Sequence, residues 1–161
     1  MTADPVPADL TPVEPAYKTR LRVGAILFWL PVLIGSFVLD RLVLAETAVA
    51  GLLPALLFLV AFSSAIYAPG RIYQRLGYAI DGRLLRVVRG WMFHTDTVVP
   101  FVRVQHIDVA RGPIDKMFGL AQLVVHTAGT HNSVVTLPGL SPETAAAIRD
   151  AIRAEIRADA E

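Results

Sequence analysis

The chain has 161 residues, of which 54% are hydrophobic and only 18% are charged. A soluble domain carries about 25% charged residues, so this composition indicates that part of the chain lies outside water. The net charge of +1 gives no basic footprint for nucleic acid, and the absence of cysteine excludes disulfides, thiolate nucleophiles and cysteine-ligated metals.

The first segment, residues 1–17, is rich in proline and acidic side chains and contains few large apolar residues. Such a composition buries too little apolar surface to offset the entropy of ordering the chain. We therefore expect residues 1–17 to form a flexible tail.

Two charge-free hydrophobic runs follow, at residues 23–39 and 47–70, with a short polar interruption between them. A helix needs about 20 apolar residues to cross a bilayer, with about 17 as the lower limit. The second run exceeds this length, and the first is near the limit. The pattern predicts a transmembrane hairpin over residues 18–70, with helices at about 22–40 and 47–69.

Two alternatives to this hairpin are less well supported. A signal peptide does not fit the first run, because a second run follows almost at once without a small-residue cleavage site. A buried helical hairpin of a soluble protein fits the lengths poorly. Pro31 and Pro54 would be costly inside a soluble helix, but membrane helices tolerate proline.

Basic residues flank the hairpin on its outer ends. They are Lys18, Arg20 and Arg22 before the first run, and Arg71 and Arg75 after the second. Because positive residues favour the cytoplasmic side, we expect a multi-pass protein with both termini in the cytoplasm.

Residues 71–161 have the pattern of a strand-rich domain. Short β-prone runs alternate with turn signals at Asp81-Gly82, Arg89-Gly90 and Gly112-Pro113. This predicts an antiparallel sheet or barrel of about six or seven strands.

The C-terminal part of this domain predicts one helix. Ser141-Pro142 is typical of a helix start, and Ile148, Ile152 and Ile156 recur every four residues. The isoleucine stripe is expected to pack on the sheet. The neighbouring arginine stripe forms either a solvated face or a contact with anionic lipid.

Several motifs in the domain resemble one known family. They are Val99-Pro100-Phe101-Val102-Arg103-Val104-Gln105-His106-Ile107-Asp108-Val109, Gly112-Pro113, Phe118-Gly119-Leu120-Ala121, Val125-His126-Thr127-Ala128-Gly129-Thr130 and Leu137-Pro138-Gly139-Leu140. With two membrane helices before them, these motifs resemble the YdbS-like family of bacterial pleckstrin-homology membrane proteins.

The resemblance implies a membrane α-hairpin followed by an α+β pleckstrin-homology-like domain, closed by the C-terminal amphipathic helix. It also implies the inner membrane of a bacterial cell, and a membrane protein partner such as a larger relative with several such domains. Lys116 departs from the family pattern, which has arginine before Phe-Gly-Leu. Lysine keeps the charge but loses bidentate geometry.

Polar residues of these motifs are candidates for an interaction surface. They are Arg103, Gln105, His106, Lys116 and His126. Strand alternation predicts that Arg103, Gln105 and Ile107 share one face. Such residues are either solvated, hydrogen-bonded positions or contacts for a partner.

Arginines near the second membrane run are candidates for contacts with lipid headgroups. They are Arg71, Arg75, Arg83, Arg86 and Arg89. Each cation near an anionic leaflet contributes about 1 kcal/mol to membrane attraction, although these residues could serve only to set topology. The hairpin turn at Asp81-Gly82 is too short to cradle a phosphoinositide.

The sequence gives little support for catalysis. A metal site needs three or four convergent ligands, and beside His106, His126 and His131 only Asp108 could help. No phosphate-binding glycine loop or acid–base pair of carboxylates is present, so we expect neither a cofactor nor an enzyme. The sequence favours a membrane-anchored protein-interaction or scaffold module, with anionic-lipid binding or sensing as the alternative.

Overall fold

A computed structural model of the chain describes residues 10–91, 93–128 and 134–158. The chain divides into two compact units. One unit is Lys18–Arg71, and the other combines Met1–Tyr17 with Ile72–Glu161. We describe each unit by itself.

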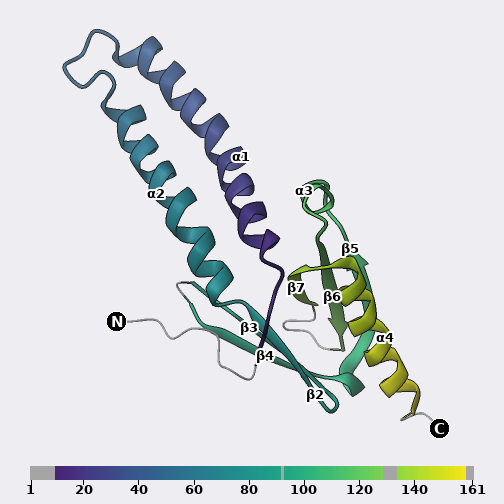
Figure 1. The fold of residues 1–161 in the computed structure, drawn as a ribbon. Coiled ribbons are helices and arrows are strands. Elements are labelled where there is room, and N and C mark those ends of the chain that lie inside the picture. The colour runs from purple at the N-terminus through teal and green to yellow at the C-terminus, as the bar shows by residue number, and fades with distance from the viewer. Residues whose placement is uncertain (1–9, 92, 129–133, 159–161) are drawn as a thin grey trace. The chain divides into compact units, whose positions relative to one another are not determined.

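The first unit is a pair of long helices joined by a short connector (Figure 1). Helix α1 covers Ala16–Leu39 and continues as a π-helix, η1, over Asp40–Leu44, whereas α2 covers Leu52–Gln74. Both are long and apolar enough to cross a membrane, as the hydrophobic runs predict. The second helix begins and ends five residues later than expected.

The connector explains where α2 begins. The carboxylate of Asp40 is buried and accepts the Gly51 N–H at 2.8 and 3.0 Å from its two oxygens. Gly51 has a φ of 82°, which stops the helix from starting earlier. Pro54 consequently lies in the first turn of α2, where a missing N–H costs little, and Pro69 takes the interior position instead.

The second unit contains two antiparallel sheets. The first sheet has the order β1-β2-β3-β4, and the second has the order β5-β6-β7. The strands are β1 Thr11–Pro12, β2 Gly77–Asp81, β3 Leu84–Arg89, β4 Thr95–Pro100, β5 Val104–Ala110, β6 Ala121–Thr127 and β7 Val134–Leu140. The helical segments are the 3-10 helix η2 Phe101–Arg103, α3 Pro113–Met117 and α4 Pro142–Ala158.

The antiparallel sheet is confirmed, whereas the alternative of a barrel is not supported. The two sheets do not pair with each other in the part of the chain that the structure describes. After Pro100 the chain turns through η2 rather than continuing in the ladder, and a proline cannot donate a ladder hydrogen bond. The chain therefore leaves one sheet before it enters the next.

The predicted hairpin turn joins β2 and β3. Asp81 pairs with Leu84, and Gly82 between them has a φ of 53°. A two-residue loop with glycine in the left-handed region matches the twist of the strands.

The C-terminal helix forms as the sequence predicts. The Thr144 N–H donates to the Ser141 hydroxyl at 3.1 Å, which caps α4 at its start. Ile148 and Ile152 are buried, whereas Ile156 is only half-buried. The core of the domain includes fully buried leucines and valines from both sheets, namely Leu85, Val87, Leu123, Val125 and Leu137.

The expected flexible tail is wrong for residues 10–17. Leu10, Val13 and Tyr17 are buried, and β1 adds a short edge strand beside β2. The Glu14 N–H donates to the Gly139 carbonyl at 2.8 Å. Three apolar anchors and backbone hydrogen bonds therefore hold this proline-rich segment. The remainder of the predicted tail, residues 1–9, lies outside the described residues.

Candidate functional site

The domain has a groove of about 280 Å³ between the start of β5 and the last turns of α4. Its lining residues are Val104, Gln105, His106, Ile107, Arg153, Ile156 and Arg157. Pockets that bind small molecules have volumes of at least about 300 Å³. The groove is slightly smaller, and it has room for one or two side chains of a partner.

The groove runs along the backbone edge of β5. Side chains of successive strand residues point to opposite faces, yet four consecutive residues of β5 line this groove. Within the described residues β5 is an edge strand, because its sheet has the order β5-β6-β7. An edge strand offers N–H and C=O groups to another chain.

A β-bulge shapes this edge. The register with β6 shifts between Val104, which pairs with Thr127, and His106, which pairs with His126. Gln105 is thus the extra residue of the bulge, and its side chain is exposed. The bulge turns Gln105 out of the regular ladder at the groove.

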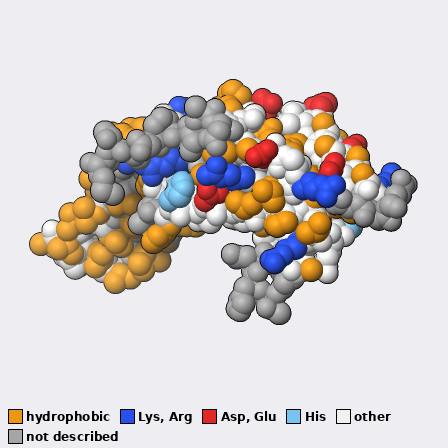
Figure 2. Space-filling model, turned by 90° about the horizontal axis from the view of Figure 1, so that it is seen from below, with side chains coloured by type: hydrophobic (Ala, Val, Ile, Leu, Met, Phe, Trp, Pro, Cys, Tyr) orange, Lys and Arg blue, Asp and Glu red, His pale blue; other side chains and the backbone are white. Residues whose placement is uncertain are grey.

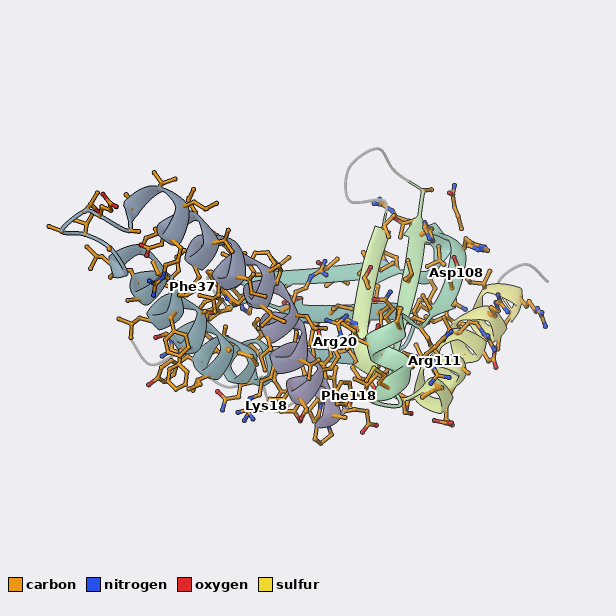
Figure 3. All side chains as sticks on the ribbon, turned by 90° about the horizontal axis from the view of Figure 1, so that it is seen from above. Lys18, Arg20, Phe37, Asp108, Arg111 and Phe118 are labelled. Atoms are coloured by element: carbon orange, nitrogen blue, oxygen red, sulfur yellow. The ribbon has the colours of Figure 1, made fainter. Side chains whose placement is uncertain are left out.

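Two histidines and one carboxylate form a polar cluster next to the groove. The His106 and His126 rings are 5.8 Å apart between centroids. Asp108, labelled on β5 in Figure 3, lies 2.9 Å from His106 Nε2 and 3.7 Å from His126 Nε2. Because all three side chains are at least 40% exposed, the pairing orients His106 without isolating it from solvent.

The structure brings only some of the predicted interaction residues together. Gln105 and His106 line the groove, and His126 joins them through Asp108. Arg103 instead lies in η2, so the expected shared strand face with Gln105 is wrong. Lys116 lies exposed on α3 and does not line the groove.

The groove also contains residues that sequence reasoning missed. Arg153 and Arg157 come from the arginine stripe of α4, interpreted above as either a solvated face or a lipid contact. Their four-residue spacing puts both on one side of the helix. Nothing in the local sequence shows that this side meets the edge of a strand about fifty residues away.

Three of the arginines expected to contact lipid headgroups, namely Arg83, Arg86 and Arg89, interact with other residues of the domain. Arg83 forms an ion pair with Glu155 at 2.9 Å, and Arg89 donates to the Thr136 carbonyl at 3.4 Å. Arg86 and Arg89 are three residues apart on β3, which places them on opposite faces.

The other two arginines lie at the end of α2. Arg75 donates to the Trp91 carbonyl, and Arg71 is exposed in the last turns of the helix. On the face shown in Figure 2, blue basic side chains lie beside red acidic ones. Within the domain, Arg83, Arg86 and Arg89 therefore do not form a single basic patch, because each pairs with a different residue.

Arg86 and Asp96 form a bidentate pair across β3 and β4. Arg86 Nε lies 3.0 Å from both Asp96 oxygens, and Arg86 Nη2 lies 2.6 Å from Oδ2. These hydrogen bonds lower the pKa of Asp96 below its usual value. The pair ties together the two strands of the β3–β4 hairpin.

Asp96→Asn should weaken the acid dependence of domain stability. A lowered pKa makes the stabilisation complete above the ordinary aspartate pKa of 3.8 and lost as the pH falls through the folded value. Because both side chains are about one-third exposed, the effect should be about 0.5–1 kcal/mol. Urea unfolding from pH 2.5 to pH 7 measures it. Parallel curves for wild type and variant would refute the assignment.

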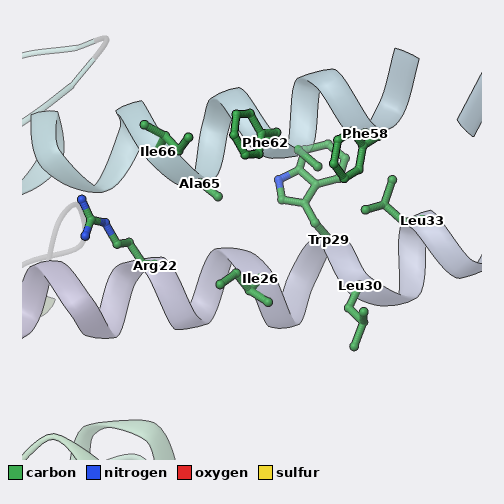
Figure 4. A pocket seen from close by; sticks show the side chains of 10 residues that line it. Arg22, Ile26, Trp29, Leu30, Leu33, Phe58, Phe62, Ala65 and Ile66 are labelled. Carbon is green, nitrogen blue, oxygen red and sulfur yellow. The ribbon is translucent and has the colours of Figure 1, made fainter. Parts of the chain in front are cut away.

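The helical unit has its own apolar groove, of about 550 Å³, between α1 and α2. Figure 4 shows Trp29 between the two helices beside Phe58 and Phe62, with Arg22 at one end. Between apolar helices of this length, lipid or another helix would fill such a groove.

No group of three His, Asp or Glu side chains among the residues that the structure describes is arranged so that it could hold a metal ion. His131, which the sequence placed near His126, lies outside them.

Comparison with known proteins agrees with this architecture. The family model described as "Bacterial PH domain" matches residues 20–156. The chain is 31% identical over 104 residues to the UPF0699 transmembrane protein YdbS of Bacillus subtilis (strain 168). This match covers 65% of the chain and 64% of that relative, and thus less than two thirds of the relative's length. No solved structure matches significantly. Because the family model spans most of the sequence, the chain belongs to the bacterial PH domain family.

Proposed function

We propose that this protein is a non-enzymatic, membrane-anchored interaction module. Its two apolar helices cross the inner membrane of a bacterial cell, and its PH domain lies in the cytoplasm with both termini. The observation that carries this proposal is the basic groove between the edge of β5 and α4. The domain would use this groove to bind another membrane protein.

The groove is suited to an acidic, extended segment of a partner. The β5 edge supplies backbone donors and acceptors, as in recognition by strand addition. Arg153 and Arg157 supply positive charge, and neither has a salt-bridge partner within the described residues. Guanidinium groups bind carboxylates through charge-assisted, bidentate hydrogen bonds. A larger relative with several such domains is a candidate source of the segment.

The open shape of the groove and the residues that line it favour recognition over catalysis. Cationic, amide and aliphatic side chains form its walls. The neighbouring His106–Asp108 pair lies on the exposed surface of β5, where water competes for every hydrogen bond.

Arg157→Glu should weaken binding of an acidic peptide. The full-length protein in nanodiscs of neutral lipid would be titrated with a fluorescent glutamate-rich decapeptide. Loss of one charge-assisted hydrogen bond costs about 1.5–3 kcal/mol, so the affinity should fall by about tenfold to a hundredfold. Ala151→Glu is the matched control, since Ala151 is exposed on α4, does not line the groove and is neither three nor four residues from Arg153 or Arg157. It should change the affinity by less than about threefold.

A photocrosslinker at Gln105 tests the same site in membranes. Crosslinks to an acidic segment of one membrane protein, lost in Arg157→Glu and retained in Ala151→Glu, are the expected result. Crosslinks mainly to lipid, or peptide binding that is equal in the two variants, would contradict the proposal. Binding that requires anionic vesicles and not the peptide would favour lipid sensing instead.

A further inference from the structure

The tip of the β3–β4 hairpin exposes two large aromatic side chains. Trp91 is 40% exposed and Phe93 is 80% exposed. Gly90 begins this tip with a φ of 150°, and a Cβ at this position would lie 1.9 Å from the Phe93 carbonyl oxygen. The backbones of Gly90 and Phe93 therefore approach each other closely, and the Trp91 and Phe93 rings are exposed rather than buried in the core.

This tip is tied to the end of α2. The Arg75 guanidinium donates a hydrogen bond to the Trp91 carbonyl, and Gly77, at the start of β2, pairs with Val88 of β3. Arg75 follows α2 directly, because the helix ends at Gln74. The charge-free run of this helix ends at Gly70.

Chain connectivity limits how far the tip can lie from the hydrocarbon. Arg75 is five residues beyond Gly70, which corresponds to about 7 Å at 1.5 Å per residue. The headgroup layer on each side of a bilayer is about 5–7 Å thick. A backbone group that accepts a hydrogen bond from Arg75 is consequently within reach of the headgroups.

We propose that Trp91 and Phe93 insert into the headgroup region of the same membrane that α2 leaves. Tryptophan favours this region, because its ring is apolar while its N–H can reach water or headgroups. The bilayer is the occupant that the chemistry and the link to α2 indicate together. The contact gives the PH domain an attachment to the membrane besides the chain itself. It does not depend on the proposed groove.

Tryptophan fluorescence tests this insertion in the full-length protein. The chain has two tryptophans, so Trp29→Phe leaves Trp91 as the single emitter. The variant would be reconstituted in phosphatidylcholine vesicles with bromine at defined depths. Trp91 should be quenched most by shallow bromines, and its quenching by iodide should be at least about threefold weaker than that of a water-exposed tryptophan.

The control places a tryptophan elsewhere on the same domain. Val102→Trp in a Trp29→Phe/Trp91→Phe background puts it in η2, where Val102 is 74% exposed. This position lies beyond the far end of β4, about 20 Å from the tip at 3.3 Å per strand residue. It should be quenched by iodide and not by brominated lipid.

Phe93→Ser provides a second, independent readout. Because Phe93 is largely exposed, the variant should fold, as circular dichroism would verify. Iodide quenching of Trp91 should rise at least about twofold as the tip loses one of its two apolar anchors. If Trp91 is quenched by iodide like the control, or is shielded from iodide without being quenched by brominated lipid, the insertion is refuted. In the second case protein covers the ring.

Discussion

Replacing Gly139 by alanine is expected to destabilise the PH domain by about 2–5 kcal/mol. Gly139 has a φ of 77°, and a Cβ built on it would lie 2.7 Å from Cγ of Tyr17. A left-handed conformation costs an L-residue about 1–2 kcal/mol, and overpacking a filled site adds about 1–3 kcal/mol. The collision should also displace residues 10–17, since the Gly139 carbonyl accepts the Glu14 N–H.

Gly82→Ala separates these two costs. Gly82 also has a positive φ, of 53°, but no atom lies within 4 Å of a Cβ at this position. This variant should lose only about 1–2 kcal/mol, from backbone strain alone. Urea unfolding of the full-length protein in detergent, followed by near-ultraviolet circular dichroism, measures both. Equal losses in the two variants would show that Tyr17 does not pack against Gly139.

Hydrogen exchange locates the effect. In Gly139→Ala, the amide protons of residues 10–17 should lose protection together with those of β7. Tyr17→Ala removes the colliding ring and leaves only its Cβ, 3.0 Å away, so Gly139→Ala should cost clearly less in that background than in the wild type. A full additional loss in the double variant would mean that the collision is not the cause.

The elements that depend on local pattern are predictable from this sequence. The two long apolar helices follow from hydrophobic length, the β2–β3 turn from Asp81-Gly82, and α4 from a four-residue isoleucine period. Each of these signals lies within one contiguous stretch of the chain. Because these signals are local, the structure confirms the elements that they predict.

The N-terminal segment was not predictable because its stabilisation comes from distant residues. Leu10, Val13 and Tyr17 are three apolar side chains in a segment whose composition is typical of disorder. Their order depends on β2 and on Gly139, which lie more than sixty residues away along the chain. A local sequence pattern carries no information about contacts between residues so far apart in the chain.

The candidate site was likewise predictable only in part. Strand alternation drew attention to Gln105 and His106, which the structure places in the groove. The bulge and η2 break that alternation, so the side chain of Arg103 could not be placed from the pattern. Arg83, Arg86 and Arg89 are close in sequence, but strand alternation puts Arg86 and Arg89 on opposite faces of β3. Arg83 and Arg86 form ion pairs with Glu155 and Asp96.

Ile152→Ala should cost the domain about 2–5 kcal/mol, the usual loss for truncating a buried isoleucine. Ile152 has an exposed fraction of 0% and lies on the face of α4 that packs on the sheets. Urea unfolding of the full-length protein should show a lower midpoint with an unchanged slope. A loss below 1 kcal/mol would mean that α4 does not close the core.

Ile156→Ala is the matched control one turn later on the same helix stripe. Ile156 is half-buried and lines the groove, so its truncation opens no core cavity and should cost less than about 1 kcal/mol. It should instead weaken binding of the acidic peptide, because the groove loses an apolar wall. The opposite effects of the two variants would separate the part of α4 that closes the core from the part that binds. Equal stability losses would mean that Ile156 belongs to the core as Ile152 does. Peptide binding that Ile156→Ala leaves unchanged would exclude the groove as the docking site.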